Sequence, residues 1–598
     1  MQAFVLFDDA VQQQGVLLQQ FIQQHDLTAE QLPELDKLLA SGWEQGWHCA
    51  VFIEYEFGLQ LQQLPLPAGI NGQLHLYWFK QKTILPSPLD WLQQQLTEEP
   101  AGISTPVIEE EFATYQSKIQ AIHEAIRRGD VYQINYTTRL HMHTYGHPLK
   151  LYHRLRQAVP YAVLAHLPNH HWTLCFSPEL FLRVLPNGQV ETEPMKGTAP
   201  ILNDGLDEQR AEYLRHDSKN LAENLMIVDL LRNDLGKIAV TGSVQVPHPF
   251  TVTAFGKVWQ MTSKVQAQLK PQTSVADILL ASFPCGSITG APKRKSMELI
   301  QSLENTPRHL YTGSIGFLEQ DANSPLGFTA CLNVAIRTLA LIPTPTSSQE
   351  VANNDTAYIA QYGVGGGIVI DSQAQSEYEE CGWKASFITQ LRPECGLFET
   401  MRVHQQKIAL LPYHLNRLAH SAHALNIPFQ RQTAEELLHK TLSTLLPEQD
   451  YRLKLSLSSQ GELQLEAHPY QAPAYHAVTI SPQRLVNHDP LRRHKTTSRA
   501  IFDQAWQTAV QQQAFDMLFF NQQGFLLEGG RSSVMIKFEE QWLTPALTLD
   551  ILNGVTRQQA LQQGIATEAY ITEKMLYQAS KIRLGNALHG WFEVELRL

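Results

Sequence analysis

A lysine within the stretch VETEPMKGTAP, residues 190–200, raises the first chemical question. Lys196 stands between a small acidic cluster and a glycine, just past a predicted strand. Such a lysine is either a solvated surface cation or, where a dry site lowers the pKa of its amine, a nucleophile. The residues around Lys196 leave both alternatives open.

Three glutamates are candidates for binding a metal ion. Glu223 falls in a long predicted helix, and Glu377 and Glu380 are one helical turn apart in SEYEECGWKA, so they share a helix face. Glu223 and Glu380 would suit Mg²⁺, which takes a few carboxylate oxygens and completes its shell with water and substrate. The alternative is that both are solvated glutamates.

Two glycine-containing stretches could bring backbone N–H groups close to an anion. The stretch GVGGGIVI is predicted to be a strand without a following helix, so it lacks the geometry of a dinucleotide-binding loop, yet its glycines permit close backbone approach. FPCGSITGAPK is a turn before a helix predicted to start near Pro292. Arg337, in NVAIRT, alternates with apolar residues and would accept a substrate carboxylate if it faces a cavity.

A second group of candidate residues follows residue 390. Lys495 lies in the basic cluster RRHKTTSRAIFDQA, and such clusters are usually solvated. LLEGGRSSVMI places Glu528 just after a glycine turn, and ILNGVTRQQ puts a Gly-Val-Thr turn at a helix start, which suits a phosphate group.

Length and composition bound the class of protein. A chain of 598 residues exceeds one hydrophobic core, so at least two domains are expected. The net charge of −12 without clustered Lys and Arg argues against nucleic-acid binding. The six cysteines show no CxxC pair, and we find neither an export signal nor a long apolar run, so we expect a reducing, cytoplasmic environment and no membrane span.

The elements predicted to position these residues form an α+β protein. We predict glutamine-rich amphipathic helices over 15–39, a helix over 114–128, a hairpin over 174–195 about LPNGQ, and one helix over 208–235. The apolar stripe of that last helix is predicted to contain Leu221, Leu225, Val228 and Leu231. Residues 341–357 are predicted to be an exposed loop, and the domains are placed at 1–390 and 391–598.

Five motifs of the first region, with core positions over 115–385, stand in the order found in a known family. They are LAENLMIVDLLRNDLG, FPCGSITGAPK, YTGSIGFL, AIRT and GGGIVIDS followed by EYEECGWKA. The region resembles the chorismate-utilising enzymes, which include anthranilate synthase, isochorismate synthase, salicylate synthase and aminodeoxychorismate synthase component I. The resemblance implies an antiparallel sheet and helix sandwich that acts on chorismate.

The resemblance also assigns roles to the candidate residues. It implies that Glu223 and Glu380 bind Mg²⁺, with Glu377 behind them. The expected substrate-binding residues are Tyr311, Arg337, Thr289, Gly290, Gly365, Gly366, Gly367 and Lys384.

Within this family, Lys196 discriminates between two reactions. Anthranilate synthases carry alanine at this position, whereas aminodeoxychorismate synthases carry lysine. The resemblance implies that Lys196 attacks ring carbon C2 while Glu179, in FSPELFL, protonates the departing C4 hydroxyl. Gln260 stands where the family often has histidine, so the role of that histidine does not transfer.

The second region resembles the fold-type IV pyridoxal-phosphate enzymes, which have two subdomains of α+β structure. CGLFETMRV and LLPYHLNRLAHSAHAL add to the motifs quoted above. The resemblance implies that Lys495 bonds to the cofactor and moves the proton, that Glu528 pairs with the pyridinium nitrogen, and that Arg417 binds the phosphate. Val555 and Thr556 would bind the phosphate through their backbone.

The fusion of the two regions implies a bifunctional enzyme. The first domain would convert chorismate and ammonia to 4-amino-4-deoxychorismate, and the second would eliminate pyruvate to give 4-aminobenzoate, a folate precursor. No glutaminase motif is visible, so ammonia is expected from a separate glutamine amidotransferase subunit or from solution. The alternative is an anthranilate-synthase-like first domain followed by an aminotransferase-like or inactive regulatory domain. A homodimer through the second region stays an open alternative.

Overall fold

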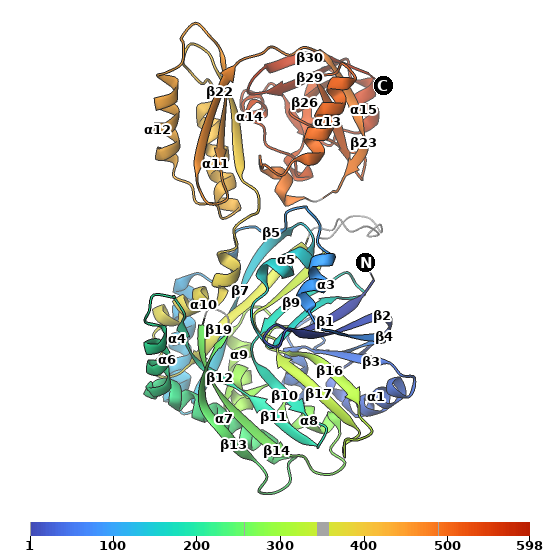
Figure 1. Cartoon of the computed structure of the whole chain (residues 1–598), viewed down its shortest axis with the longest axis vertical. Helices are drawn as coiled ribbons and strands as arrows, with labels where there is room; N and C mark the ends of the chain where they lie inside the picture. Colours follow the sequence, from blue (N-terminus) through green and yellow to red (C-terminus); the bar gives the residue numbers. More distant parts are fainter. Residues whose placement is uncertain (1, 256–257, 344–357, 488, 598) are drawn as a thin grey trace.

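The structure, a computed structural model, describes residues 2–255, 258–343, 358–487 and 489–597. The predicted loop over 341–357 lies outside these residues except for its first three positions, which end a strand. Two bodies joined by one linking segment are visible in Figure 1, with the first third of the second body lying beside the remainder. None of the helices in the described ranges is both long and apolar enough to cross a membrane.

The strands of the first body form one continuous antiparallel ladder. At one end, β14 (Val258–Gln268) pairs with β13 (Gln245–Phe255) on one edge and, on its other edge, with β12 (Met195–Pro200) and β11 (Gln189–Glu193). From β11 the pairing order continues through β10 (Leu180–Val184), β17 (Phe328–Val334), β16 (Ser314–Gln320), β3 (His48–Ile53), β4 (Leu74–Leu85), β2 (Gln14–Leu27), β1 (Phe4–Asp9), β8 (Tyr161–His166), β9 (Trp172–Ser177), β18 (Thr338–Pro343), β19 (Tyr358–Ile368) and β7 (Gln133–Tyr145). Three short strands also pair with β7: β5 (Gly102–Ile103), β6 (Val107–Ile108) and β15 (Gly290–Ala291).

Alternation of side chains along these strands builds a layered sandwich. In β3, Cys49 and Val51 enter one apolar cluster while Ala50 and Phe52 enter another, because successive side chains point to opposite faces. The ladder folds back around the cluster that contains Ala50 and Phe52, and helices cover its outer faces. One face is covered by α1 (Leu35–Glu44), α2 (Tyr55–Leu61), α7 (Ser218–Gly236) and α8 (Val275–Ser282), and another by α3 (Pro88–Gln94), α5 (Pro148–Leu155) and α10 (Ala374–Thr389). Two more helices, α4 (Phe112–Arg127) and α9 (Lys293–Leu303), pack on β7, and α6 (Asp207–His216) lies beside β12.

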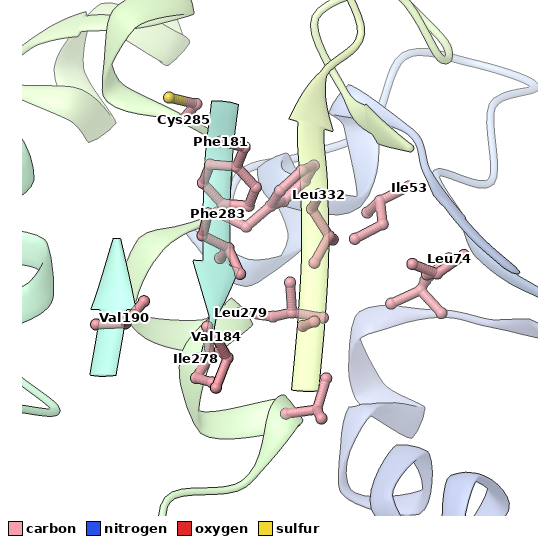
Figure 2. Packing of buried hydrophobic residues seen from close by; sticks show 14 of the residues in the cluster. Ile53, Leu74, Phe181, Val184, Val190, Ile278, Leu279, Phe283, Cys285 and Leu332 are labelled. Carbon is pink, nitrogen blue, oxygen red and sulfur yellow. The ribbon is translucent and has the colours of Figure 1, made fainter. Parts of the chain in front are cut away.

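One part of this core holds the start of β10 against the turn that follows α8. Figure 2 shows Phe181 and Val184 of β10 facing Phe283 and the α8 residues Ile278 and Leu279. The rings of Phe181 and Phe283 meet edge to face with centroids 5.9 Å apart, a favoured aromatic geometry. This packing holds the strand that follows Glu179 against the segment that leads into the turn over 285–290.

Two predictions of secondary structure were wrong. Residues 14–27 form strand β2 instead of a helix, because pairing with β1 and β4 on both sides satisfies their backbone groups. The helix over 208–235 is two helices, α6 and α7, broken at Asp217, whose carboxylate accepts the Asn220 N–H as the cap of α7. The buried stripe of α7 also differs, because Leu225 is exposed while Asn224 is fully buried.

Other predicted elements were confirmed. The helix predicted over 114–128 is α4, and Gly129 follows it in the left-handed region with φ +81°. The predicted hairpin contains β10 and β11, joined by a turn in which the Gly188 N–H donates to the Leu185 carbonyl at 2.9 Å. Glu377 and Glu380 share α10, and the glycine-rich stretch is strand β19.

The second body has two subdomains, as the resemblance implied. The smaller one pairs β20 (Leu397–Val403), β21 (Tyr451–Leu457) and β22 (Leu463–Pro469), with α11 (Leu411–Ala424) and α12 (Arg431–Leu442) on one face. The larger one is a mixed sheet in the order β25 (Leu526–Gly529), β24 (Asp516–Asn521), β23 (Ala477–Leu485), β30 (Gly590–Leu596), β29 (Lys581–Asn586), β26 (Ser533–Phe538), β27 (Gln541–Pro545) and β28 (Thr567–Ala569), with α13 (Ala500–Gln511), α14 (Val555–Gln562) and α15 (Glu573–Gln578).

Several contacts join the two bodies. The Thr105 N–H donates to the Ala424 carbonyl at 3.0 Å, and the Asn426 side-chain amide donates to the Thr389 carbonyl at 2.6 Å. Tyr145, the last residue of β7, is buried in the apolar cluster of the smaller subdomain. The end of β7 is therefore part of the core of its neighbour.

Candidate active sites

Lys196 and Glu179 lie close together in the first body. The Lys196 Nζ donates to the Ser287 carbonyl at 3.3 Å, and burial lowers the pKa of its amine. Glu179 precedes β10 and is buried, and this burial raises the pKa of its carboxyl to about 7 against the opposing effects of Ser287 and Lys196. Glu179 Oε1 is buried without a hydrogen-bond partner among the described residues. An amine and a carboxyl whose pKa values shift toward each other can act as base and acid near neutral pH.

A bulge in β12 determines where the Lys196 side chain points. The pairing of β12 with β14 shifts register between Met195 and Thr198, and Gly197 has φ +88°. A Cβ at Gly197 would lie 3.0 Å from the side chains of Leu214 and Asn220, so glycine also suits the available space. Bulges of this kind redirect a side chain and recur next to active sites.

The three predicted metal-binding glutamates lie near one another, in the N-terminal halves of α7 and α10. The Lys219 Nζ is 3.9 Å from Oε1 of both Glu223 and Glu377, and the Lys384 Nζ is 2.7 Å from Glu380 Oε1. Burial, together with the neighbouring carboxylates, raises the pKa of Glu223 and of Glu377. The adjacent Lys384 ammonium instead lowers the pKa of Glu380.

This arrangement fits a divalent cation that shares its shell with substrate and water. Within the described ranges no three such groups are close enough to enclose an ion by themselves. Gly366 faces the cluster, because a Cβ there would lie 3.3 Å from Glu377 Oε2 and 4.0 Å from Glu380 Oε1. Glycine thus leaves open the space between the carboxylates, and Mg²⁺ commonly uses only one or two protein carboxylates.

The glycines of β19 leave room for three different neighbours. A Cβ at Gly363 would lie 2.3 Å from the Tyr311 ring, and one at Gly365 would lie 2.2 Å from the Tyr136 carbonyl oxygen. A Cβ at Gly367 would lie 2.0 Å from the side-chain amide nitrogen of Gln133 and 3.2 Å from Lys196 Nζ. The glycine positions of β19 therefore lie next to the predicted nucleophile and the predicted substrate-binding tyrosine.

Arg337 and the turn over 285–290 complete this site. Arg337 has φ +51°, and burial lowers the pKa of its guanidinium, which makes no hydrogen bond or ion pair with any residue the structure describes. An unpaired guanidinium in such a place favours an anionic ligand. In the turn, the Thr289 hydroxyl donates to backbone carbonyls. Gly290 has φ +149°, and a Cβ at this position would lie only 2.2 Å from the Gln133 carbonyl oxygen, so no larger residue fits.

Sequence reasoning did not assign Gln133 to this site. Its side chain is fully buried and its Oε1 has no partner among the described residues, while its amide nitrogen faces Gly367. Gln260 is likewise buried with an unpartnered Oε1, and it pairs across strands with Thr198. A buried polar residue within a predicted strand was the available signal for Gln133.

In the second body, Lys495 and Glu528 face one cavity. Burial, with help from Arg499 and Arg417, lowers the pKa of Lys495 to about 7, and its Nζ lies 4.6 Å from the Phe398 ring centre. Burial raises the pKa of Glu528 to about 7, and its Oε1 accepts the Leu552 N–H at 3.0 Å. A lysine that is partly neutral at pH 7 can bond to a carbonyl carbon.

An anion site lies at the start of α14 in the same cavity. The Thr556 hydroxyl is buried without a partner among the described residues, in the first turn of α14, where helix N–H groups favour a phosphate. Arg417 lies nearby but is not free, because its guanidinium binds the buried Glu399 carboxylate at 2.6 and 2.8 Å. These features fit the phosphate of pyridoxal phosphate, with Arg417 held in place by Glu399.

The cavity has a volume of about 1320 Å³ and extends to the first body. Lys495, Glu528 and Thr556 line it, and so do residues 97, 99–100 and 144–147 of the first body. The β20 edge beside it bonds to the segment that carries Lys495, because the Phe398 N–H donates to the Lys495 carbonyl at 3.0 Å.

Comparisons with known proteins agree with this division. The profile of the chorismate binding enzyme family matches residues 18–390, and that of class IV amino-transferases matches residues 396–596. Aminodeoxychorismate synthase component 1 of Escherichia coli is 39% identical over 269 residues, which are 44% of this chain and 54% of that protein. Anthranilate synthase component 1 of Methanothermobacter thermautotrophicus is 35% identical over 273 residues, 45% of this chain and 54% of that protein.

A solved structure from Bacillus anthracis, named as a putative isochorismate synthase, shares the fold with a TM-score of 0.52. The two chains are 20% identical, and the match covers 65% of this chain and 95% of that one. The chain spans about half the length of the curated relatives it matches. Since the first family profile covers well over half of the chain, the protein belongs to the chorismate binding enzymes, and a class IV amino-transferase region follows that domain.

Proposed function

We propose that the protein makes 4-aminobenzoate in two steps, amination of chorismate to 4-amino-4-deoxychorismate and then elimination of pyruvate. The observation that carries the proposal is the placement of Lys196 beside the buried Glu179, since the lysine separates this reaction from anthranilate formation. The similarity to aminodeoxychorismate synthases supports it. The domains are proposed to meet between residues 390 and 391.

In the first step the Lys196 amine forms a bond to ring carbon C2 of chorismate. The ring double bonds shift, the bond from C4 to its hydroxyl breaks, and the Glu179 carboxyl gives its proton to the departing oxygen, which leaves as water. Ammonia then bonds to C4, the double bonds shift back, and the bond between Lys196 and C2 breaks. The pKa of about 7 for Glu179 keeps a substantial fraction protonated for this task near neutral pH.

Substrate would be held by residues that surround this pair. We assign its carboxylates to Arg337, Tyr311, Thr289, Lys384 and the backbone of the glycines at 290 and 365–367. Mg²⁺ held by Glu223 and Glu380, with Glu377 behind them, would neutralise a substrate carboxylate as a Lewis acid. The unpaired guanidinium and the open space at Gly366 support these assignments.

In the second step the Lys495 amine takes the proton from C4 of the intermediate. The bond from C3 to the enolpyruvyl oxygen breaks, the ring becomes aromatic, and the released enolpyruvate takes a proton to become pyruvate. Bound pyridoxal phosphate would supply the electron sink for this step. Glu528 would pair with its ring nitrogen, while Arg417, Val555 and Thr556 would hold its phosphate.

We further propose that ammonia comes from a separate glutamine amidotransferase subunit and that the enzyme works in the cytoplasm. The naming of the relatives as a first component supports the former, and six unpaired cysteines support the latter. A homodimer through the second domain is proposed as the form in solution, by analogy with fold-type IV enzymes.

The test is to supply chorismate, Mg²⁺ and ammonium and to identify the product by mass, with and without pyridoxal phosphate. The proposal expects 4-aminobenzoate and pyruvate with the cofactor, and 4-amino-4-deoxychorismate without it. Anthranilate as the product would overturn the first assignment. Accumulation of 4-amino-4-deoxychorismate despite bound cofactor would overturn the second.

A further inference from the structure

One face of the smaller subdomain's sheet looks into the cavity that contains Lys495. Along β21, Leu453 and Leu455 are buried in the core, so Arg452 and Lys454 project from the opposite face. Both residues line the cavity, as do Phe398 and Thr400 of the neighbouring β20. Thr400 and Lys454 stand opposite each other in the register of the two strands.

Arg452 and Lys454 lie on a sheet face that also carries Glu466, which stands opposite Lys454 in the register of β21 and β22. Neither side chain makes a hydrogen bond or ion pair with a residue in the described ranges. By contrast, Arg402 on the same sheet face binds Asp450 at 2.7 Å, and Arg417 binds Glu399. The Lys454 Nζ lies 5.8 Å from the Phe398 ring centre, and the Lys495 Nζ lies 4.6 Å from the same centre. The unpaired cation and the reactive amine therefore both lie close to the Phe398 ring.

We propose that Lys454 and Arg452 bind the two carboxylates of the substrate in the second site and make it selective for a dicarboxylate amine. This inference rests on the proposed function, whose intermediate carries one carboxylate across the ring from its amine and another on the enolpyruvyl group. The phosphate of the cofactor is proposed to bind at the start of α14, so Arg452 and Lys454 on β21 remain available to bind the substrate. Substrates with a single carboxylate would leave one of them unpaired.

The test compares Lys454→Gln and Arg452→Gln with Lys440→Gln, which removes an exposed lysine of α12 outside the cavity lining. With 4-amino-4-deoxychorismate supplied, each of the first two variants is expected to raise KM for 4-aminobenzoate formation about tenfold, because a charge-assisted hydrogen bond is lost. The turnover number and the visible absorption of bound cofactor are expected to stay close to wild type, and Lys454→Arg to restore KM.

A second readout does not depend on turnover. Isophthalate, which has two carboxylates, and benzoate, which has one, are titrated against the cofactor absorption, so that only binding in the second site is seen. The wild type and Lys440→Gln are expected to prefer isophthalate about tenfold, and Lys454→Gln to lose this preference. Unchanged KM and unchanged preference in both β21 variants would overturn the inference. Absence of 4-aminobenzoate from the wild type would overturn the proposed function, while the dicarboxylate preference would still decide the inference.

Discussion

Replacing Gly366 by alanine tests whether the space beside the three glutamates is needed for the first reaction, with little effect on the stability of the fold. The added methyl carbon would lie 3.3 Å from Glu377 Oε2, 3.7 Å from Lys384 Nζ and 4.0 Å from Glu380 Oε1. A shift of a few tenths of an ångström in one side chain accommodates it, so we expect a stability loss within about 1 kcal/mol. The methyl group occupies space proposed for the cation and substrate, and displacing the substrate by about 1 Å would cost on the order of 10²-fold in rate.

The assay measures 4-amino-4-deoxychorismate formation against Mg²⁺ concentration, with thermal unfolding of the same samples. Gly366→Ala is expected to unfold near the wild-type temperature, to lose about 10²-fold in rate and to need more Mg²⁺. Gly365→Ala is the control, because its methyl carbon would lie 2.2 Å from the Tyr136 carbonyl, a backbone atom, and overpacking of this kind costs about 1–3 kcal/mol or more. Wild-type rate and wild-type Mg²⁺ dependence in Gly366→Ala would refute the reasoning.

Four further outcomes are expected from Glu179, Lys196 and Lys495. The first reaction, measured at constant free ammonia, should slow as pH rises through about 7. The reason is that the pKa of Glu179 is raised to about 7, so its carboxyl carries the proton below that pH and has lost it above. A flat pH profile would exclude Glu179 as the acid. Glu179→Gln should reduce the rate by roughly 10²–10⁴-fold and remove this pH dependence. Lys196→Ala should abolish 4-amino-4-deoxychorismate, detected by mass, and full activity in that variant would rule out a nucleophilic role. Lys495→Ala should abolish the visible absorption band of lysine-bound cofactor and cause 4-amino-4-deoxychorismate to accumulate.

Local signals predicted the elements whose residues act through their immediate neighbours. Asn187 and Gly188 specify a hairpin turn in any context that supplies two strands, and Gly129 ends α4 because few other residues adopt its left-handed conformation. The motifs placed Glu377 and Glu380 on one helix, and the structure confirms that placement.

Features that depend on distant partners could not be read from the sequence. The glutamines of residues 14–27 suit a helix locally, but β1 and β4 turn the segment into a strand. The pairing of Arg417 with Glu399, and the approach of Gln133 to Gly367, join residues that no local pattern connects. For the same reason the sequence could not predict how the charges of the candidate site residues are balanced.

Strand β7 connects the neighbourhoods of the two sites. Its first residue, Gln133, faces Gly367 beside Lys196, while its last residues, Thr144 and Tyr145, line the cavity of the second body. Thirteen residues in an extended strand span about 40 Å, and unbroken pairing with β19 keeps that span rigid. The two ends of this one strand therefore lie beside different sites. Under the proposed function, an intermediate made near Gln133 would have to leave that site before the second site could bind it.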